Sequence, residues 1–207
     1  METLRMLILS LLAGAAVYLL LPQPLQARLS LSVAASCFFY LFPTPASLVL
    51  AALVFWDRMN DDAESRKFAL LPALGAAGVI FFWLLPLGVQ ALQPVMGHLG
   101  ISPPDPVSQP VGWLLAIRSC LAVPLLEEYL CRSWFLGRVL RQRFDVRDSL
   151  AISSLVFAVL HFQPAALVAH ALAGVIYGWL YENHGFWSAA TAHSLTNSLS
   201  LILSLFR

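Results

Sequence analysis

Two adjacent glutamates inside a long apolar segment are the strongest chemical signal in the sequence. Glu127 and Glu128 lie in the stretch PLLEEYLCR, which Arg132 ends. A charged side chain at the centre of a membrane helix costs about 2.5 to 3.5 kcal/mol, so such residues usually mark a site. At the helical period of about 100° per residue, Glu128 and Arg132 share one face with the acid N-terminal, which favours an ion pair. We therefore expect Arg132 to neutralise Glu128 and Glu127 to face a cavity as a base; a purely structural charge cluster is the alternative.

Two histidine-containing segments follow on later apolar stretches. His161 ends the segment FAVLH, in which Phe157 lies one turn earlier on the same face, and His193 shares a face with Asn197 in HSLTN. Alone, His161 is better explained as a hydrogen-bonded histidine inside the bundle than as a catalyst. The pair His193 and Asn197 is equally well explained by hydrogen bonds between membrane helices. Counted from the basic or polar ends of the apolar stretches at about 1.5 Å per residue, Glu127 and these polar groups lie roughly 10 to 21 Å deep. Three helices are therefore expected to bring them to one layer.

The elements that position these side chains are predicted to be membrane helices. Hydrophobic residues make up 59% of the 207 residues, charged residues make up 11%, and the mean hydropathy is +0.78. Soluble domains carry roughly 25% charged residues. This composition argues against a soluble enzyme, a disordered chain and a nucleic-acid-binding protein. We predict an all-α, polytopic transmembrane helix bundle whose environment is the lipid bilayer.

About seven membrane spans are predicted, or eight if the segment 29–56, which Pro43 and Pro45 interrupt, forms a hairpin. The apolar stretches are 6–21, 29–56, 68–92, 111–136, 149–162, 165–181 and 187–206, and about 20 apolar residues are needed to cross the hydrocarbon core. Residues 1–110 are interpreted as generic N-terminal transmembrane helices. Residues 111–207 are interpreted as a four-helix catalytic core within the same integrated membrane domain.

The loops predict an orientation and a location. The loop 137–148 contains four arginines and the loop 93–110 contains no lysine or arginine. Because cytoplasmic loops collect basic residues, the first is expected inside and the second outside. The compact chain with short loops is typical of a multi-pass protein of the bacterial inner membrane.

The motifs EExxxR, FxxxH and HxxxN, in this order on successive helices, resemble those of the CPBP family, which includes CAAX prenyl endopeptidases and bacteriocin-processing relatives. The resemblance covers residues 111–205 and extends to GVIYGWLY at 174–181. It implies a glutamic-type intramembrane endopeptidase, in which Glu127 and His161 activate water while His193 and Asn197 hold the oxyanion.

The resemblance also implies a membrane-associated protein or peptide as substrate, one that is lipid-modified or carries a membrane helix. Some relatives resemble scaffolds or immunity proteins, so a non-proteolytic role is one alternative. Around the four predicted catalytic residues, three others are expected to support the site: Glu128, Arg132 and Phe157.

Two further functions use the same side chains. Two histidines and a glutamate with an open position are typical of a hydrolytic zinc site, but the sequence lacks HExxH and the histidines lie on separate helices. No cofactor is therefore expected, with zinc as the alternative. Buried Glu and His chains also occur in proton-coupled carriers, although the sequence shows no inverted repeat or paired broken helices.

Three neighbours of these motifs are given structural interpretations. Cys131 lies on the face of Glu127, but apolar burial makes a thiol inert, so we interpret it as a small core residue. His170 lies at a similar depth among alanines and is predicted to serve helix packing. Pro124 has no N–H and leaves one helical carbonyl without its partner, so an opening for water is expected there.

Overall fold

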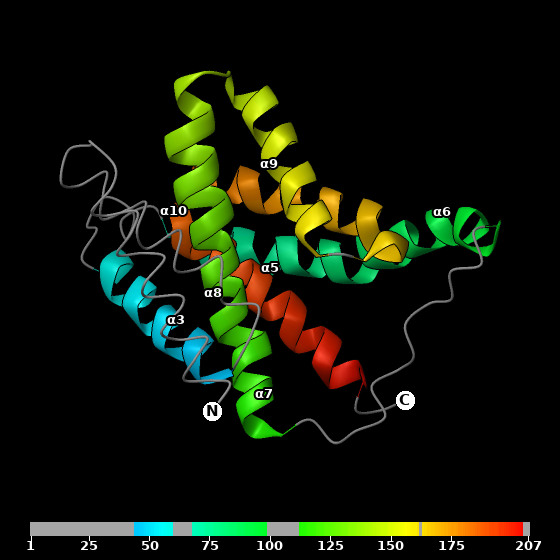
Figure 1. The fold of residues 1–207 in the computed structure, drawn as a ribbon, viewed down its shortest axis with the longest axis horizontal. Helices are drawn as coiled ribbons and strands as arrows, with labels where there is room; N and C mark the ends of the chain where they lie inside the picture. The colour runs from blue at the N-terminus through cyan, green and yellow to red at the C-terminus, as the bar shows by residue number, and fades with distance from the viewer. Residues whose placement is uncertain (1–43, 60–67, 99–111, 162, 205–207) are drawn as a thin grey trace.

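The structure, a computed structural model, describes residues 44–59, 68–98, 112–161 and 163–204, and every regular element within these residues is a helix. Figure 1 shows these helices crossing one another around a common centre. The predicted all-α class is confirmed for this part of the chain. The expected first helix, 6–21, and the first part of the segment 29–56 lie outside the described residues.

Two described helices are long and apolar enough to cross a membrane, namely Leu70–His98 and Pro164–Ser204. Both exceed the length of about 20 residues that the hydrocarbon core requires. The total of seven or eight spans stays a prediction, because it counts segments outside the described residues.

Two helical segments precede the predicted catalytic core. Helix α3 (Thr44–Met59) begins beside the predicted proline interruption. A second helix is continuous through α5 (Leu70–Val79), the π-helical turn η2 (Ile80–Leu84) and α6 (Leu85–His98). It extends beyond the predicted end at residue 92. Pro94 removes only one hydrogen-bond donor from α6, and apolar residues continue up to the buried Met96.

The central helix, residues 113–142, carries both glutamates and alternates between α and π segments. A π segment pairs each N–H with the carbonyl five residues earlier, and such segments are frequent at functional sites. The helix runs past its predicted end at residue 136. Its segments are α7 (Trp113–Ile117), η3 (Arg118–Ala122), α8 (Val123–Glu128), η4 (Tyr129–Val139) and the 3₁₀ turn η5 (Leu140–Gln142).

The last two helices carry the histidine segments. Helix α9 (Val146–Leu160) starts with the Asp145 side chain accepting a hydrogen bond from the Asp148 N–H at 2.8 Å, as is typical of an N-cap. A 3₁₀ turn, η6 (Pro164–Ala166), leads into α10 (Leu167–Ser204).

Helix α10 consists of two halves, as the sequence predicted. They meet at Gly185, where φ is +75° and ψ is 175°. Only glycine adopts this conformation without strain. Figure 1 shows the two halves diverging from this bend, the first in orange and the second in red.

The helices pack around two clusters of buried apolar side chains that share α10. The first joins α3, the middle of the central helix and the second half of α10. The second joins α5, η2, η4, α9 and both halves of α10. The clusters are Leu50, Ala51, Val54, Ala122, Leu126, Tyr129, Phe186 and Ala190, and Ala73, Ala76, Ile80, Cys131, Phe157, Ala173, Tyr177, Leu180, Ala189 and Ala192.

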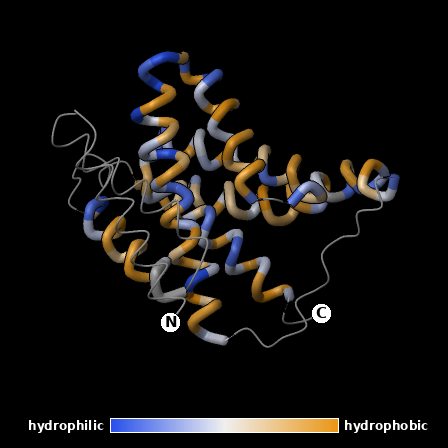
Figure 2. The backbone as a smooth tube through the Cα atoms, viewed as in Figure 1, coloured by the Kyte–Doolittle hydropathy of each residue, from blue (hydrophilic) through white to orange (hydrophobic). Residues whose placement is uncertain are grey.

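The outer surface exposes large apolar side chains, and a polar turn lies at one end of the molecule. Leu71 is 80% exposed and Trp56 is 74% exposed, as expected for side chains that face lipid. In Figure 2, hydrophilic colour gathers at the turn between η4 and α9, within the predicted basic loop. Arg141 of this turn forms an ion pair with Glu182 at 3.4 Å. This contact connects the basic turn to the end of the first half of α10.

Candidate active site

Three of the predicted catalytic side chains lie together. Glu127 is near the end of α8, His161 caps the end of α9, and His193 is in the second half of α10. Glu127 Oε2 is 3.5 Å from His193 Nε2 and 3.8 Å from His161 Nε2. The second distance is too long for a direct hydrogen bond and is short enough for one water to contact both groups.

Glu128 contacts two partners. Its Oε2 lies 3.2 Å from Arg132 Nε, which confirms the predicted ion pair, and both side chains are fully buried. Its Oε1 lies 2.9 Å from His193 Nδ1. The sequence analysis expected Arg132 as the partner of Glu128 and did not anticipate the histidine. We call Glu127, Glu128, Arg132 and His193 the charged centre.

Arg132 is held by partners on two other helices. One terminal nitrogen donates to Ser153 Oγ of α9 at 3.4 Å, and the other donates to the carbonyl of Gly174 of α10 at 3.2 Å. Its guanidinium carbon lies 4.7 Å from the centre of the Phe157 ring, which is cation–π geometry. Arg132 therefore ties the central helix to α9 and α10.

The ring of His161 is oriented by its own helix. His161 Nδ1 lies 2.7 Å from the backbone oxygen of Phe157. A carbonyl oxygen only accepts, so Nδ1 carries the proton and donates it. In the neutral ring the lone pair is then on Nε2, the atom that faces Glu127. His161 Nε2 can consequently accept a hydrogen bond from a water that also contacts Glu127.

Asn197 is anchored to the central helix by a carbonyl that Pro124 leaves available. In η3 the Val123 N–H bonds to the carbonyl of Arg118, five residues earlier. The next donor in this register would be residue 124, paired with Ser119, but proline has no N–H. The Ser119 carbonyl instead accepts Asn197 Nδ2 at 3.0 Å. One of the two amide hydrogens is used in this way, and the second can serve a ligand.

A small cavity is lined by His161, His193 and Asn197, whereas Glu127, which was expected to face a cavity, lies behind the two histidines and is not among the lining residues. The volume of the cavity is about 130 Å³, and it is lined by Ile80, Leu85, Phe157, His161, His170, Ala173, Tyr177, His193, Thr196, Asn197 and Ser200. Since one water takes up about 30 Å³ of liquid volume, this space suits a few waters or one peptide group.

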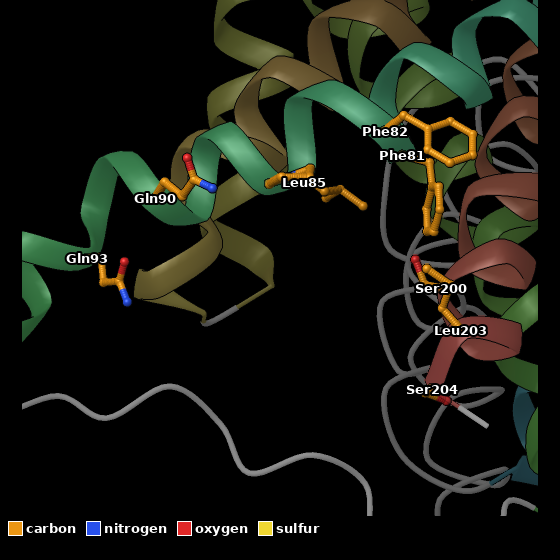
Figure 3. A pocket seen from close by; sticks show the side chains of 9 residues that line it. Phe81, Phe82, Leu85, Gln90, Gln93, Ser200, Leu203 and Ser204 are labelled. Atoms are coloured by element: carbon orange, nitrogen blue, oxygen red, sulfur yellow. The ribbon is translucent and has the colours of Figure 1, made fainter. Parts of the chain in front are cut away.

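A larger groove adjoins the cavity and shares Leu85 and Ser200 with it. Its volume is about 620 Å³, within the usual range of ligand sites. Figure 3 shows aromatic side chains of η2, the amides of α6 and the end of α10 around this space. The lining residues are Phe81, Phe82, Leu85, Pro86, Gln90, Gln93, Ser200, Leu203 and Ser204.

Two rings outside the predicted catalytic set contact its histidines; the sequence analysis gave His170 a packing role and gave Tyr177 no role in the site. The Tyr177 ring stacks on His193 with 4.6 Å between centroids and 16° between planes. The His170 ring stacks on His161 at 4.0 Å and 21°. Tyr177 belongs to the GVIYGWLY segment that the sequence analysis noted, so this segment was the available signal. Cys131 is buried in the second apolar cluster, as its structural interpretation expected.

Among the described residues, no group of three or more His, Cys, Asp or Glu side chains is arranged to hold a metal ion.

Comparison with known proteins identifies one match. Residues 109–199 match the family model described as Type II CAAX prenyl endopeptidase Rce1-like. No match was found among curated proteins or among solved structures. The family match confirms the resemblance that the three motifs predicted, and with it the peptidase class. The matched segment contains every predicted site residue.

Proposed function

Because residues 109–199 match the family model described as Type II CAAX prenyl endopeptidase Rce1-like, we propose that the chain is a membrane-integral peptidase of this kind. We propose that it cleaves a peptide bond by a glutamic-type mechanism. One observation carries the mechanism: Glu127 Oε2 lies within 3.8 Å of the Nε2 atoms of both His161 and His193. A carboxylate and two imidazoles thereby converge beside a cavity large enough for water.

Water activation is assigned to Glu127 and His161. A water between them donates its hydrogens to Glu127 Oε2 and to the lone pair of His161 Nε2. As the water oxygen bonds to the peptide carbon, one proton moves to the carboxylate, and the carbonyl electron pair moves onto oxygen. A positioned base of this kind contributes about 10² to 10⁴ in rate.

His193 is assigned as an oxyanion donor in its protonated form. Its Nδ1 donates to Glu128, so Nε2 also carries a hydrogen only when the ring is an imidazolium. Charge balance supports this state, because the charged centre then contains two carboxylates and two cations. An uncompensated buried charge would be strongly unfavourable. Glu128 is thus proposed to hold the ring of His193 as well as the side chain of Arg132.

Asn197 is assigned as the second oxyanion donor. Its amide is fixed by the Ser119 carbonyl at 3.0 Å and lines the cavity with His193. Donors that are held before the reaction stabilise developing charge without reorganising. When the tetrahedral intermediate collapses, the carbon–nitrogen bond breaks and the proton held by Glu127 passes to the amine nitrogen. The products are a new carboxyl end and a new amino end.

The substrate is proposed to be a membrane-associated protein or peptide that reaches the cavity along the groove. The groove has an aromatic wall at Phe81 and Phe82 and amides at Gln90 and Gln93. The aromatic wall suits an apolar or lipid-modified part of the substrate. The amides suit an extended backbone, whose carbonyl and N–H groups need partners within a membrane. We place this reaction in a multi-pass protein of the bacterial inner membrane.

The test is cleavage by the purified full chain in detergent. Three probes are compared by mass spectrometry: a prenylated peptide with a CAAX end, a leader peptide and a peptide with a C-terminal membrane helix. We expect the parent to cleave at least one and folded Glu127→Gln to cleave none. A folded parent that leaves all three intact would favour the scaffold interpretation.

The same assay decides the question of metal. A glutamic mechanism predicts that cleavage continues after treatment with a chelator, because no Lewis acid is removed. Stoichiometric zinc in active protein, with activity lost on chelation and restored by zinc, would replace this mechanism with the zinc alternative.

A further inference from the structure

We propose that His170 is a positioning residue that holds the His161 ring in the orientation needed to activate water. This inference rests on the proposed function, since it concerns the residue that shares the water with Glu127. It assigns a role in the reaction to a histidine that the sequence analysis interpreted as a packing residue.

One hydrogen bond does not fix the His161 ring. The bond from Nδ1 to the Phe157 carbonyl restrains the position of that one atom, and the ring can still tilt by coupled rotation about its Cα–Cβ and Cβ–Cγ bonds. Rotation would swing Nε2 away from Glu127 Oε2, now 3.8 Å distant. A second contact on the ring face is needed to prevent it.

His170 makes that contact. Its ring lies 4.0 Å from the His161 ring, with 21° between their planes. The Phe157 ring meets His161 edge-on at 4.6 Å and 63°. A parallel ring on the face and an aromatic ring at a steep angle restrict the rotation that the hydrogen bond allows. Stacked ring pairs of this kind are favourable beyond the burial of their surfaces.

His170 lies in the first turn of α10 and has contacts of its own. Its Nε2 lies 3.4 Å from Gln163 Oε1, just before η6. The ring also contacts Phe157 at 6.5 Å and 79°. Because His170 and His161 both line the cavity, the stack forms part of its wall. The start of α10 therefore supports the end of α9 where the reaction takes place.

Two substitutions separate the ring face from the imidazole nitrogens. His170→Ala removes the ring, and His170→Phe keeps a flat ring while removing both nitrogens. We expect His170→Ala to lower kcat about tenfold to a hundredfold with KM little changed, because small misplacements of a catalytic group have costs of that order. We expect His170→Phe and Gln163→Ala to retain most of the activity. His184→Ala is the matched control in the same helix, since His184 contacts the Trp179 ring and does not line the cavity.

A second measurement is independent of turnover. Modification of His161 by diethyl pyrocarbonate, followed by mass spectrometry, is expected to be several-fold faster in His170→Ala than in the parent and near parental in His170→Phe. Failure of the parent to cleave any probe would overturn the proposed function and leave this measurement valid.

The positioning role is overturned by any of three results in folded protein. These are parental kcat and parental modification in His170→Ala, a His170→Ala effect confined to KM, or a His170→Phe variant as impaired as His170→Ala. An effect confined to KM would mean that His170 contacts the substrate. Equal impairment of His170→Phe would mean that the function of His170 depends on its ring nitrogens.

Discussion

The charged centre and the helix formed by α5, η2 and α6 are held in the molecule in opposite ways. Arg132 and Glu128 are fully buried and contact several helices. In α5 the buried side chains are three alanines, whereas Phe82 and Trp83 of η2 are 66% and 67% exposed.

This difference follows from the membrane as solvent. Apolar side chains gain little from leaving lipid, so helices approach through small residues. Charged side chains in the same environment must find partners. Polar contacts consequently orient the site, and the lipid-facing helix is left to form one wall of the groove.

The largest expected effects come from the two glutamates. Glu127→Gln removes the proposed base and should lower the cleavage rate about 10²- to 10⁴-fold with little change in melting temperature. Glu128→Gln should impair both properties, because breaking a buried ion pair costs about 3 to 5 kcal/mol and His193 loses its partner at 2.9 Å. Rate and thermal melting in detergent measure the two effects.

The two adjacent carboxylates are thus expected to differ, with Glu127 needed for the rate and Glu128 needed for both rate and stability. If Glu128→Gln melted like the parent and cleaved at the parental rate, the ion pair and the contact with His193 would not support the site. If Glu127→Gln cleaved at the parental rate, the proposed glutamic-type mechanism would be wrong.

Asn197→Ala tests the second oxyanion donor. We expect kcat to fall about 10²- to 10³-fold with KM and the folded fraction little changed, because the amide faces the cavity. Steady-state kinetics and size-exclusion chromatography provide the measurements. A variant that loses activity only because it unfolds would identify Asn197 as a helix–helix contact.

Pro124→Ala tests how that donor is held. The new N–H at residue 124 should compete for the Ser119 carbonyl, which now accepts Asn197 at 3.0 Å. We expect kcat to fall roughly tenfold while thermal stability is maintained or rises, since a proline inside a helix is unfavourable. Kinetics equal to the parent would show that Asn197 does not need this anchor.

A pair of glycine substitutions compares packing in the two regions. A Cβ at Gly174 would lie 3.1 Å from Ser154 and 3.3 Å from the Phe157 ring, whereas a Cβ at Gly75 would meet nothing within 4 Å. Gly174→Ala should cost about 1 to 3 kcal/mol and disturb Arg132, which donates to the Gly174 carbonyl. Gly75→Ala should be neutral or stabilising by up to about 1 kcal/mol. Equal melting temperatures would contradict the difference in packing.

The smallest effect is expected at Ser200, where the groove adjoins the cavity. Ser200→Phe should raise KM severalfold for a peptide substrate and affect kcat less, because Ser200 lines both spaces. Ser198→Phe is the control, since Ser198 also bonds to the carbonyl four residues earlier but lines neither space. If KM rose to the same extent in both variants, the groove would not be the route by which the substrate reaches the cavity.

Local sequence was sufficient for the features that depend on helix periodicity and composition. The pair Glu128–Arg132 follows from a spacing of four residues. The bend in α10 follows from Gly185, which adopts a positive φ. Counting along each apolar stretch also gives the depth of its polar residues in the membrane, and this count predicts one polar layer shared by three helices.

Contacts between helices depended on the tertiary structure. His193 and Glu128 are 65 positions apart, and Asn197 and Ser119 are 78 positions apart. Their encounter depends on where the halves of α10 cross the central helix, and the π segments η3 and η4 change which side chains face inward. Periodicity indicates which face of a helix is polar. Only the packing of α9 and α10 against the central helix decided that Glu128 would contact a histidine and that His170 would cover another.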